Sequence, residues 1–484
     1  MISLAIIIVL SLILRLISLN QSFWLDEAVQ VWTTSFSLKE LLTSYMPGDF
    51  NPPLYHLITH FWVELGTGEE VVRLLPLILG VVSIFLVYKI SNIIDCKNEM
   101  FVYFSTFLLA TSPLHIYYSQ ENRMYILACT ASLLAVYFHL YFWKKPNLIR
   151  ALAYSLGILL MSFSHFLTFF ILPVFFLFDL FNSRKLKRNL RFLWTIPFIV
   201  LALSLVIYAP LFIKQLKTGM EWTKQFPVWG KTVGSFTLKA AALLPIKFII
   251  GRISIDNKVL YGAMSVILII LYWGLAGIAI IKNIIIKTKK GRKTYKFKNT
   301  QIGLISILLV FPPLAGFLVS FFIPVFSYFR FLFVLPFFYI LISWKVTRAK
   351  ALFKPLAITL VAINLICSGV YLADSNFHRE DWQGATYWLK QKNSQYLAPV
   401  IISGQIAKPF DYYNRGDLPV IYISSNSDIE KIDQNLKETV YLVSYGLPIF
   451  DPEDKIRTVL KEKNYQMTKG ESFRKVGIEE WRIF

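Results

Sequence analysis

The chain has 484 residues, of which 56% are hydrophobic and 16% aromatic, and its mean hydropathy is +0.54. This composition excludes an ordinary soluble protein, because uninterrupted apolar stretches of roughly 18 or more residues are typical of membrane-spanning helices. The formal net charge of +21 comes from residues 1–373, which hold 35 of the 50 Lys and Arg residues and 13 of the 29 acids. These bases lie in short loops between apolar stretches, a pattern of membrane orientation that excludes nucleic acid as a partner.

Eleven apolar stretches are predicted to cross the membrane. The first lacks a basic leader and a small-residue cleavage site, so we expect it to be retained. Placing the basic loops in the cytoplasm puts the N-terminus there as well and residues 374–484 outside a plasma membrane. The predicted spans are 1–19, 71–94, 100–117, 122–142, 150–163, 166–181, 192–213, 258–281, 302–323, 328–344 and 354–373, and 237–250 is a candidate re-entrant segment.

Residues 20–70 are predicted to form an extracytoplasmic loop. It carries seven acids and one base, Lys39, and its many aromatic residues favour short helices lying at the membrane interface. The loop therefore resembles a lid over the outer ends of the spans.

Residues 374–484 are predicted to form a small extracytoplasmic α/β domain, because helix and strand patterns alternate there. "REDWQGATYWLKQ" and "DPEDKIRTVLKEK" indicate helices, and "APVIISG", "LPVIYISS" and "TVYLVSYG" indicate strands, with two more strands at the end. In "SDIEKIDQNL", Ser427 and Glu430 have the spacing of a capping box. Tyr412 and Tyr413 are candidates to stack on a sugar, with packing as the alternative.

Asp26 and Glu27 are the first candidates for chemistry. They follow the first span in "QSFWLDEAVQVW", and acids retained beside a membrane span are costly to hold in apolar surroundings. The alternative is structural, since acids in the first turn of a helix stabilise it.

A second group of polar residues lies in "TSPLHIYYSQENRMY", residues 111–125, at a predicted outer turn. A guanidinium offers a planar fork of donors to phosphate oxygens, which makes Arg123 a candidate for an anionic headgroup. The alternative is a local ion pair between Glu121 and Arg123. The other candidates for substrate contact in this stretch are His115, Tyr118, Gln120, Glu121 and Tyr125.

Two further candidates lie at predicted outer ends of spans. Arg330 in "FSYFRFLFVLP" is flanked by aromatic residues, and its alternative is an interfacial arginine that reaches toward water. His165 in "SHFLTFF" is a substrate candidate, with packing as its alternative. His56 and His60 share a helix face, but Leu57 occupies the position of the glutamate that a zinc protease needs.

Several of these segments together resemble the GT-C membrane glycosyltransferases of glycosyltransferase family 39, which includes protein O-mannosyltransferases and lipid A aminoarabinose transferases. The resemblance covers about residues 20–345, with a looser echo in "REDWQGATYWLKQ" and the strand that follows it. It rests on the acidic pair after the first span and on "NPPLYHLITHFWVELGTGEEVVRLLPLILGVVSI", "SPLHIYYSQENRMYIL" and "YFRFLFVLP".

The resemblance implies a polyprenyl-phosphate sugar donor, an acceptor outside the membrane and transfer with inversion. It also implies that Asp26 takes the acceptor proton and that Glu27 assists, and a displacement of this kind needs cations such as Arg123 and Arg330 around the leaving phosphate. Asn51 departs from the pattern, because several family members have Lys or His before the Pro-Pro pair. No cofactor follows from the sequence, and it gives no support for a divalent metal.

Two other classes of protein stay open as alternatives. A transporter or flippase of lipid-linked sugars also needs arginines and aromatic residues near a headgroup, although the chain has no visible repeat of the kind that transporters show. A non-catalytic assembly protein would use the C-terminal domain to bind partners and would tolerate replacement of Asp26.

Overall fold

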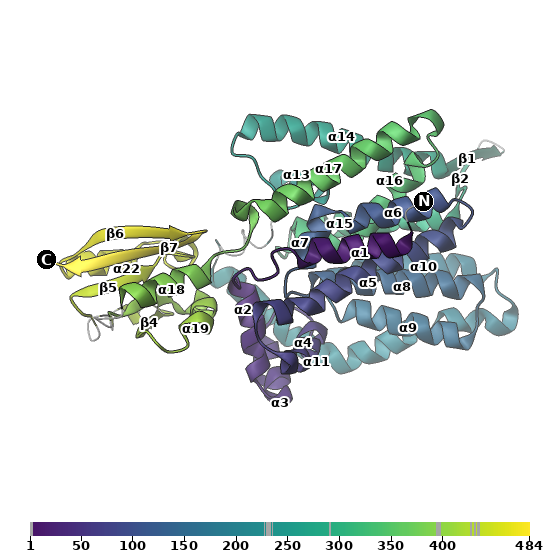
Figure 1. Cartoon of the computed structure of the whole chain (residues 1–484). Helices are drawn as coiled ribbons and strands as arrows, with labels where there is room; N and C mark the ends of the chain where they lie inside the picture. Colours follow the sequence, from purple (N-terminus) through teal and green to yellow (C-terminus); the bar gives the residue numbers. More distant parts are fainter. Residues whose placement is uncertain are drawn as a thin grey trace.

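A helical body and a small sheet domain lie end to end in the computed structural model, and the two chain termini lie at opposite ends of the molecule (Figure 1). The structure describes residues 3–226, 228, 234, 236–289, 292–393, 398–425, 428–429, 432 and 436–484.

The helical body contains the predicted membrane spans. In the part of the chain that the structure describes, eight helical stretches are long and apolar enough to cross a membrane, and three shorter apolar helices match the other predicted spans. The prediction of a multi-pass helical protein is therefore confirmed. The helices of the body are α1 (Leu4–Leu16), α5 (Glu69–Asp95), α6 (Glu99–Ala110), α7 (Pro113–Tyr118), α8 (Tyr125–Lys144), α9 (Leu148–Ser162), α10 (Leu172–Ser183), α11 (Ile196–Gln225), α13 (Leu238–Ile250), α14 (Lys258–Asn283), α15 (Thr300–Val319), α16 (Leu335–Val346) and α17 (Phe353–Ala373).

Polar caps set where several of these helices begin. Asn98, Asn147, Asn257 and Asn299 each precede a helix, and their side chains accept hydrogen bonds from backbone N–H groups in its first turn. The candidate re-entrant segment forms α13, which is capped by the following residue, Gly251, with φ of +65°. A Cβ at Gly251 would lie 3.1 Å from the backbone of Pro113 and Leu114, so glycine is needed for this close approach to α7.

The outer loop forms the short helices that the sequence predicts. They are α2 (Leu25–Trp32), α3 (Leu38–Glu40) and α4 (Leu54–Trp62), and Figure 1 shows them at the end of the helical body that is nearer the sheet domain. Gln215 of α11 holds the loop in place, because its side-chain amide donates to the carbonyls of Met46 and Asn51.

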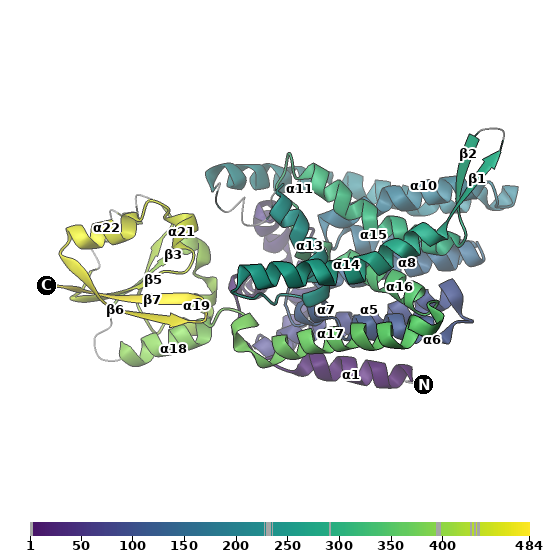
Figure 2. The ribbon, with the colours of Figure 1, turned by 90° about the horizontal axis from the view of Figure 1, so that it is seen from above.

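The sheet domain has the predicted alternation of strands and helices. Its five strands run in the order β4-β3-β5-β7-β6; β3 is parallel to β4 and β5, and β7 is antiparallel to β5 and β6. Helices α18 and α19 pack on one face and α22 on the other (Figure 2). The elements are α18 (Trp382–Lys392), β3 (Val400–Ser403), α19 (Lys408–Asn414), β4 (Val420–Ile423), β5 (Thr439–Val443), α21 (Leu447–Phe450), α22 (Lys455–Glu462), β6 (Tyr465–Phe473) and β7 (Val476–Ile483). The predicted capping box of Ser427 and Glu430 lies outside the described residues.

The two tyrosines considered for sugar stacking instead fasten the sheet domain to the outer loop. The Tyr413 hydroxyl accepts from the Phe23 N–H at 2.8 Å and donates to Glu69 at 2.7 Å. The Tyr412 hydroxyl donates to the Thr67 carbonyl at 3.0 Å. Their packing role follows from their place on α19, the helix that contacts α2.

Candidate active site

Asp26 lies where the outer loop, the helical body and the sheet domain meet. It is in the first turn of α2, which begins at Leu25, so its position agrees with the structural alternative, an acid that stabilises the start of a helix. Its carboxylate stays 36% exposed and lies 3.5 Å from the Arg123 guanidinium. Tyr445 of the sheet domain lies within electrostatic range of the Asp26 carboxylate. Asp26 is thus a partly solvated carboxylate in a crowded interface.

Glu27 has a different environment from its neighbour. It is fully buried, and its two oxygens accept from the Arg73 guanidinium at 2.9 and 2.5 Å. The Asn122 N–H donates to the same carboxylate at 2.8 Å, and Arg379 lies 3.3 Å away. Burial opposes ionisation, but the two arginines outweigh it and lower the pKa of Glu27. We therefore interpret Glu27 as a positioning residue, because its carboxylate is enclosed by protein donors.

Arg123 pairs with Asp26 and not with Glu121, so the alternative interpretation, a local ion pair between Glu121 and Arg123, does not hold. The Glu121 carboxylate is instead 3.5 Å from Arg379. Arg123 is buried, and its Nε has no hydrogen-bond partner among the described residues. Burial disfavours its charge, yet Asp26 and neighbouring groups raise the pKa of Arg123. The guanidinium therefore stays charged and keeps a donor free for an anion.

Glu121 is the second acid near Asp26. Its Oε2 has no hydrogen-bond partner among the described residues, and neither has the Nδ2 of the adjacent Asn122. Burial is the main cause that raises the pKa of Glu121 to about 7, and Arg379 opposes the shift. Unpartnered buried polar groups are uncommon in folded proteins, so their occurrence in three consecutive residues, 121–123, indicates a site.

The raised pKa of Glu121 predicts a pH dependence of stability. The folded state holds the Glu121 proton more tightly than the unfolded chain, so stability falls as pH rises from about 4.5 to about 7. We expect Glu121→Gln to remove at most about 3 kcal/mol of this fall. The free energy of unfolding, measured from pH 5 to 8 for both proteins, checks it. Parallel curves would contradict the assignment, and Glu64→Gln, an exposed acid of the outer loop, is the control.

Arg330, Tyr125 and His165 gather beside this cluster. Arg330 lies in η7 (Tyr328–Val334) and is half-buried. Its guanidinium donates to the Pro324 and Val325 carbonyls at 3.3 Å. It also interacts electrostatically with Asp26 and Arg123. The Tyr125 ring lies 6.0 Å from the His165 ring. Burial, together with the charges of Arg330 and Arg123, lowers the pKa of His165 to about 3. His165 is therefore neutral at physiological pH.

Two predicted substrate residues, His115 and Gln120, point away from this cluster, and a third, Tyr118, packs beside it. His115 contacts Arg15 of α1 at 2.7 Å and Ser83 of α5 at 2.7 Å. Gln120 donates to α1 carbonyls and accepts from Tyr371. Tyr118 packs against the rings of Tyr117, Tyr125 and Phe329. His115 lies on α7 and Gln120 just after it, and both bond to residues of the helical body, so we assign these two to structure.

Sequence reasoning missed Arg252 and Arg379. Arg252 follows Gly251 and lies 4.8 Å from the centre of the Tyr117 ring, and Arg379 lies 4.7 Å from the same ring. Arg252 also interacts electrostatically with Glu121. Arg252 forms no ion pair within the described part of the chain. For Arg252, the only signal in the sequence was a Gly-Arg pair ending an apolar segment, which is too common to select.

Asp49 and His56 form a buried group beside Asp26 and Arg123 that was also missed. Asp49 lies 3.4 Å from His56 and accepts from the Tyr45 hydroxyl at 2.9 Å, and Asn51 donates twice to its other oxygen. Burial raises the pKa of Asp49, but His56, Arg123 and Tyr45 outweigh it and lower that pKa overall. Asn51 thus orders an acid of the outer loop. In the described ranges no group of three or more His, Cys, Asp or Glu residues is placed to hold a metal.

An outer loop folded over apolar helices, with arginines and a carboxylate beneath a small α/β domain, defines a multi-pass membrane protein with a candidate site at one end of its helical body. The sequence profile of the family described as dolichyl-phosphate-mannose-protein mannosyltransferase matches residues 51–213. No curated protein sequence matches the chain significantly.

Solved structures share the fold at low sequence identity. ArnT from Cupriavidus metallidurans bound to undecaprenyl phosphate aligns with a TM-score of 0.59 and 11% identity, covering 98% of this chain and 97% of that chain. The oligosaccharyltransferase of Archaeoglobus fulgidus, in a complex with Zn and sulfate, aligns with a TM-score of 0.54 and 13% identity, covering 95% and 71%. The resemblance to GT-C glycosyltransferases is therefore confirmed.

Proposed function

We propose that the protein transfers a monosaccharide, with inversion, from a polyprenyl-phosphate sugar to an acceptor on the extracytoplasmic side of a plasma membrane. The observation that carries this proposal is the half-exposed Asp26 carboxylate beside Arg123, with Arg330 and Arg252 within electrostatic range of the same cluster. The family match and the undecaprenyl phosphate in the ArnT structure support a polyprenyl-phosphate donor.

The proposed reaction is a single displacement. The acceptor hydroxyl attacks the anomeric carbon from the face opposite the phosphate, and Asp26 takes the hydroxyl proton as the new C–O bond forms. The bond between the anomeric carbon and the phosphate oxygen breaks, and its electron pair leaves with the polyprenyl phosphate. A general base of this kind contributes about 10²- to 10⁴-fold. The partial exposure of Asp26 leaves room for an acceptor.

The arginines suit the leaving phosphate. Within the described residues, the Arg123 Nε has no hydrogen-bond partner, and the hydrogen bonds of Arg330 to the Pro324 and Val325 carbonyls are long, at 3.3 Å. Arg252 lies over the Tyr117 ring and within electrostatic range of Glu121. Guanidinium groups aimed at a developing negative charge in a buried site stabilise the transition state. Neutral His165 and the ring of Tyr125 are suited to line the sugar, and no residue of the site is assigned to a metal.

Replacing a phosphate-binding arginine is expected to weaken both donor binding and turnover. Arg123→Gln removes a charge-assisted hydrogen bond, so kcat/KM for the donor should fall about 10- to 100-fold. Arg330→Gln should give a fall of the same order. Initial rates against donor concentration measure both, and Arg184→Gln, an exposed arginine in a predicted cytoplasmic loop, is the control. Unchanged kinetics in both site variants would remove the arginines from the donor site.

The experiment that tests the function is sugar transfer by purified protein in nanodiscs. A panel of radiolabelled polyprenyl-phosphate sugars is combined with a membrane and glycan extract, and labelled product is measured. Transfer from one donor supports the proposal. Movement of labelled donor across proteoliposomes without any transfer would favour the alternative, a transporter or flippase of lipid-linked sugars.

The proposal includes an arrangement in the membrane. Residues 1–373 form the membrane domain that carries the chemistry, and residues 374–484 form an extracytoplasmic domain that covers the site. The positions of Tyr445 near Asp26 and of Arg379 beside Glu27 support this cover. The β1–β2 hairpin, β1 (Ile284–Lys289) and β2 (Arg292–Phe297), lies at the opposite end (Figure 2) and would face the cytoplasm with the N-terminus.

A further inference from the structure

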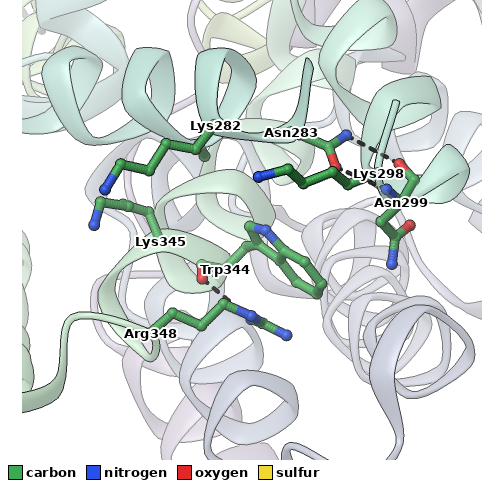
Figure 3. Close-up of a pocket in the computed structure, with 8 residues that line it drawn as sticks. Lys282, Asn283, Lys298, Asn299, Trp344, Lys345 and Arg348 are labelled. Atoms are coloured by element: carbon green, nitrogen blue, oxygen red, sulfur yellow. Dashed lines mark hydrogen bonds between the residues drawn. The ribbon is translucent and has the colours of Figure 1, made fainter. Parts of the chain in front are cut away.

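A basic pocket lies at the end of the helical body that is opposite the sheet domain. It has a volume of about 360 Å³ and is formed by the last turns of α14 and α16 and the base of the β1–β2 hairpin. Figure 3 shows the ammonium groups of Lys282 and Lys345 beside each other, with Lys298 extending toward them above the Trp344 ring. The pocket is far from the candidate active site, and nothing in the proposed reaction uses it.

The positive charge of this pocket is poorly balanced. Lys282, Lys298 and Lys345 have no carboxylate partner among the residues that the structure describes. Arg348 pairs with Asp95 and lies over the Trp344 ring. Cations at the ends of α14 and α16 complement the helix dipoles, but that effect does not require three ammonium groups around one hollow.

The local backbone holds these cations in place. The Asn283 side chain donates to the Asn299 carbonyl and accepts from the Asn299 N–H, both at 2.9 Å. The Lys298 N–H donates to the Asn283 carbonyl at 2.7 Å. This clasp ties the backbone of Lys298 and Asn299 to Asn283, the last residue of α14, so the backbone positions from which Lys282 and Lys298 extend are held together at the base of the hairpin.

Apolar surface continues from the pocket along the helices. Ile278 and Ile281 of the last turns of α14 are 40% and 70% exposed, and both lie on a helix apolar enough to cross a membrane. Ala279 and Trp344 supply the apolar wall of the pocket itself. A ligand with an anionic headgroup and hydrocarbon chains matches this junction, because cations near the ends of spans attract anionic lipids.

We propose that this pocket binds the phosphate of an anionic phospholipid headgroup, with the acyl chains along the exposed apolar face of α14. Lys282, Lys298 and Lys345 contact the phosphate, and Trp344 packs against the glycerol region. The site is separate from sugar transfer, so its occupancy affects the stability of the protein in the membrane and not the identity of its substrates.

The test is lipid binding by the full chain in detergent, measured by native mass spectrometry with dioleoyl phosphatidylglycerol and dioleoyl phosphatidylcholine. The pocket variant is the triple substitution Lys282→Gln, Lys298→Gln and Lys345→Gln. The control variant, Lys144→Gln, Lys145→Gln and Lys187→Gln, removes the same charge from exposed residues of other predicted cytoplasmic loops. We expect the wild type to prefer the anionic lipid by about tenfold or more and the pocket variant to lose that preference. The control variant should stay within about twofold of wild type.

Three outcomes would overturn the proposal. The first is an equal loss of lipid binding in both triple variants, which would assign binding to diffuse charge. The second is equal binding of the two lipids by the wild type. The third is displacement of the anionic lipid by millimolar inorganic phosphate, which would make free phosphate the ligand. If the triple variant fails to fold, Lys345→Gln alone is measured, with about a fivefold loss expected. Sugar transfer is measured separately, so a failure here leaves the proposed enzyme activity unaffected.

Discussion

Asp26→Asn is expected to abolish sugar transfer while leaving donor binding intact. The amide keeps the size of the carboxylate but cannot take the proton from the attacking hydroxyl group, so kcat should fall about 10²- to 10⁴-fold. Donor affinity should change little, because the proposed phosphate contacts are made by Arg123, Arg330 and Arg252 and not by Asp26. Turnover and donor binding are measured in parallel on nanodisc-reconstituted protein.

The control for this experiment is Glu64→Gln. Glu64 is an exposed acid of the same outer loop, so its substitution makes the same charge change away from the site. Its activity should equal that of wild type. A folded Asp26→Asn protein that transfers sugar at the wild-type rate would return Asp26 to a helix-start role, and loss of donor binding would make it a binding residue.

Glu27→Gln is expected to have the largest effect on stability. The substitution leaves Arg73 and Arg379 buried around a neutral amide, and breaking a buried ion pair in this way costs roughly 3–5 kcal/mol. Because Asn122 also donates to Glu27, the turn that carries Glu121 and Arg123 should loosen. The free energy of unfolding in mixed detergent micelles measures the effect.

Two further variants make this second prediction specific. Glu453→Gln removes an exposed acid paired with Lys455 and should change stability little, since exposed ion pairs contribute little. The double variant Glu27→Gln, Arg73→Gln should be less destabilised than the sum of the two single variants, because it removes the uncompensated charge. An additive double variant, or a stable Glu27→Gln protein, would contradict a network role for Glu27.

The sequence by itself determined the class of fold. Uninterrupted apolar stretches have one stable solution in a bilayer, the helix, because it satisfies every backbone hydrogen bond internally. The eleven predicted spans therefore coincide with apolar helices of the described chain, and the alternating pattern after residue 373 predicted the sheet domain. The same local logic placed Asp26 and Glu27 in the first turn of α2.

Only the tertiary structure decided which polar residue does what. Asp26 and Glu27 are neighbours in sequence, yet a helix turns adjacent side chains by about 100°, so one reaches a half-exposed interface and the other a buried pair with Arg73. His115 and Gln120 face α1, whereas Arg123 faces Asp26. Arg252 and Arg379 enter the site from residues more than 200 positions away from Asp26, and no local pattern encodes a contact made by packing. Hydropathy and spacing specify which segments enter the membrane, while side-chain packing between distant segments specifies the site.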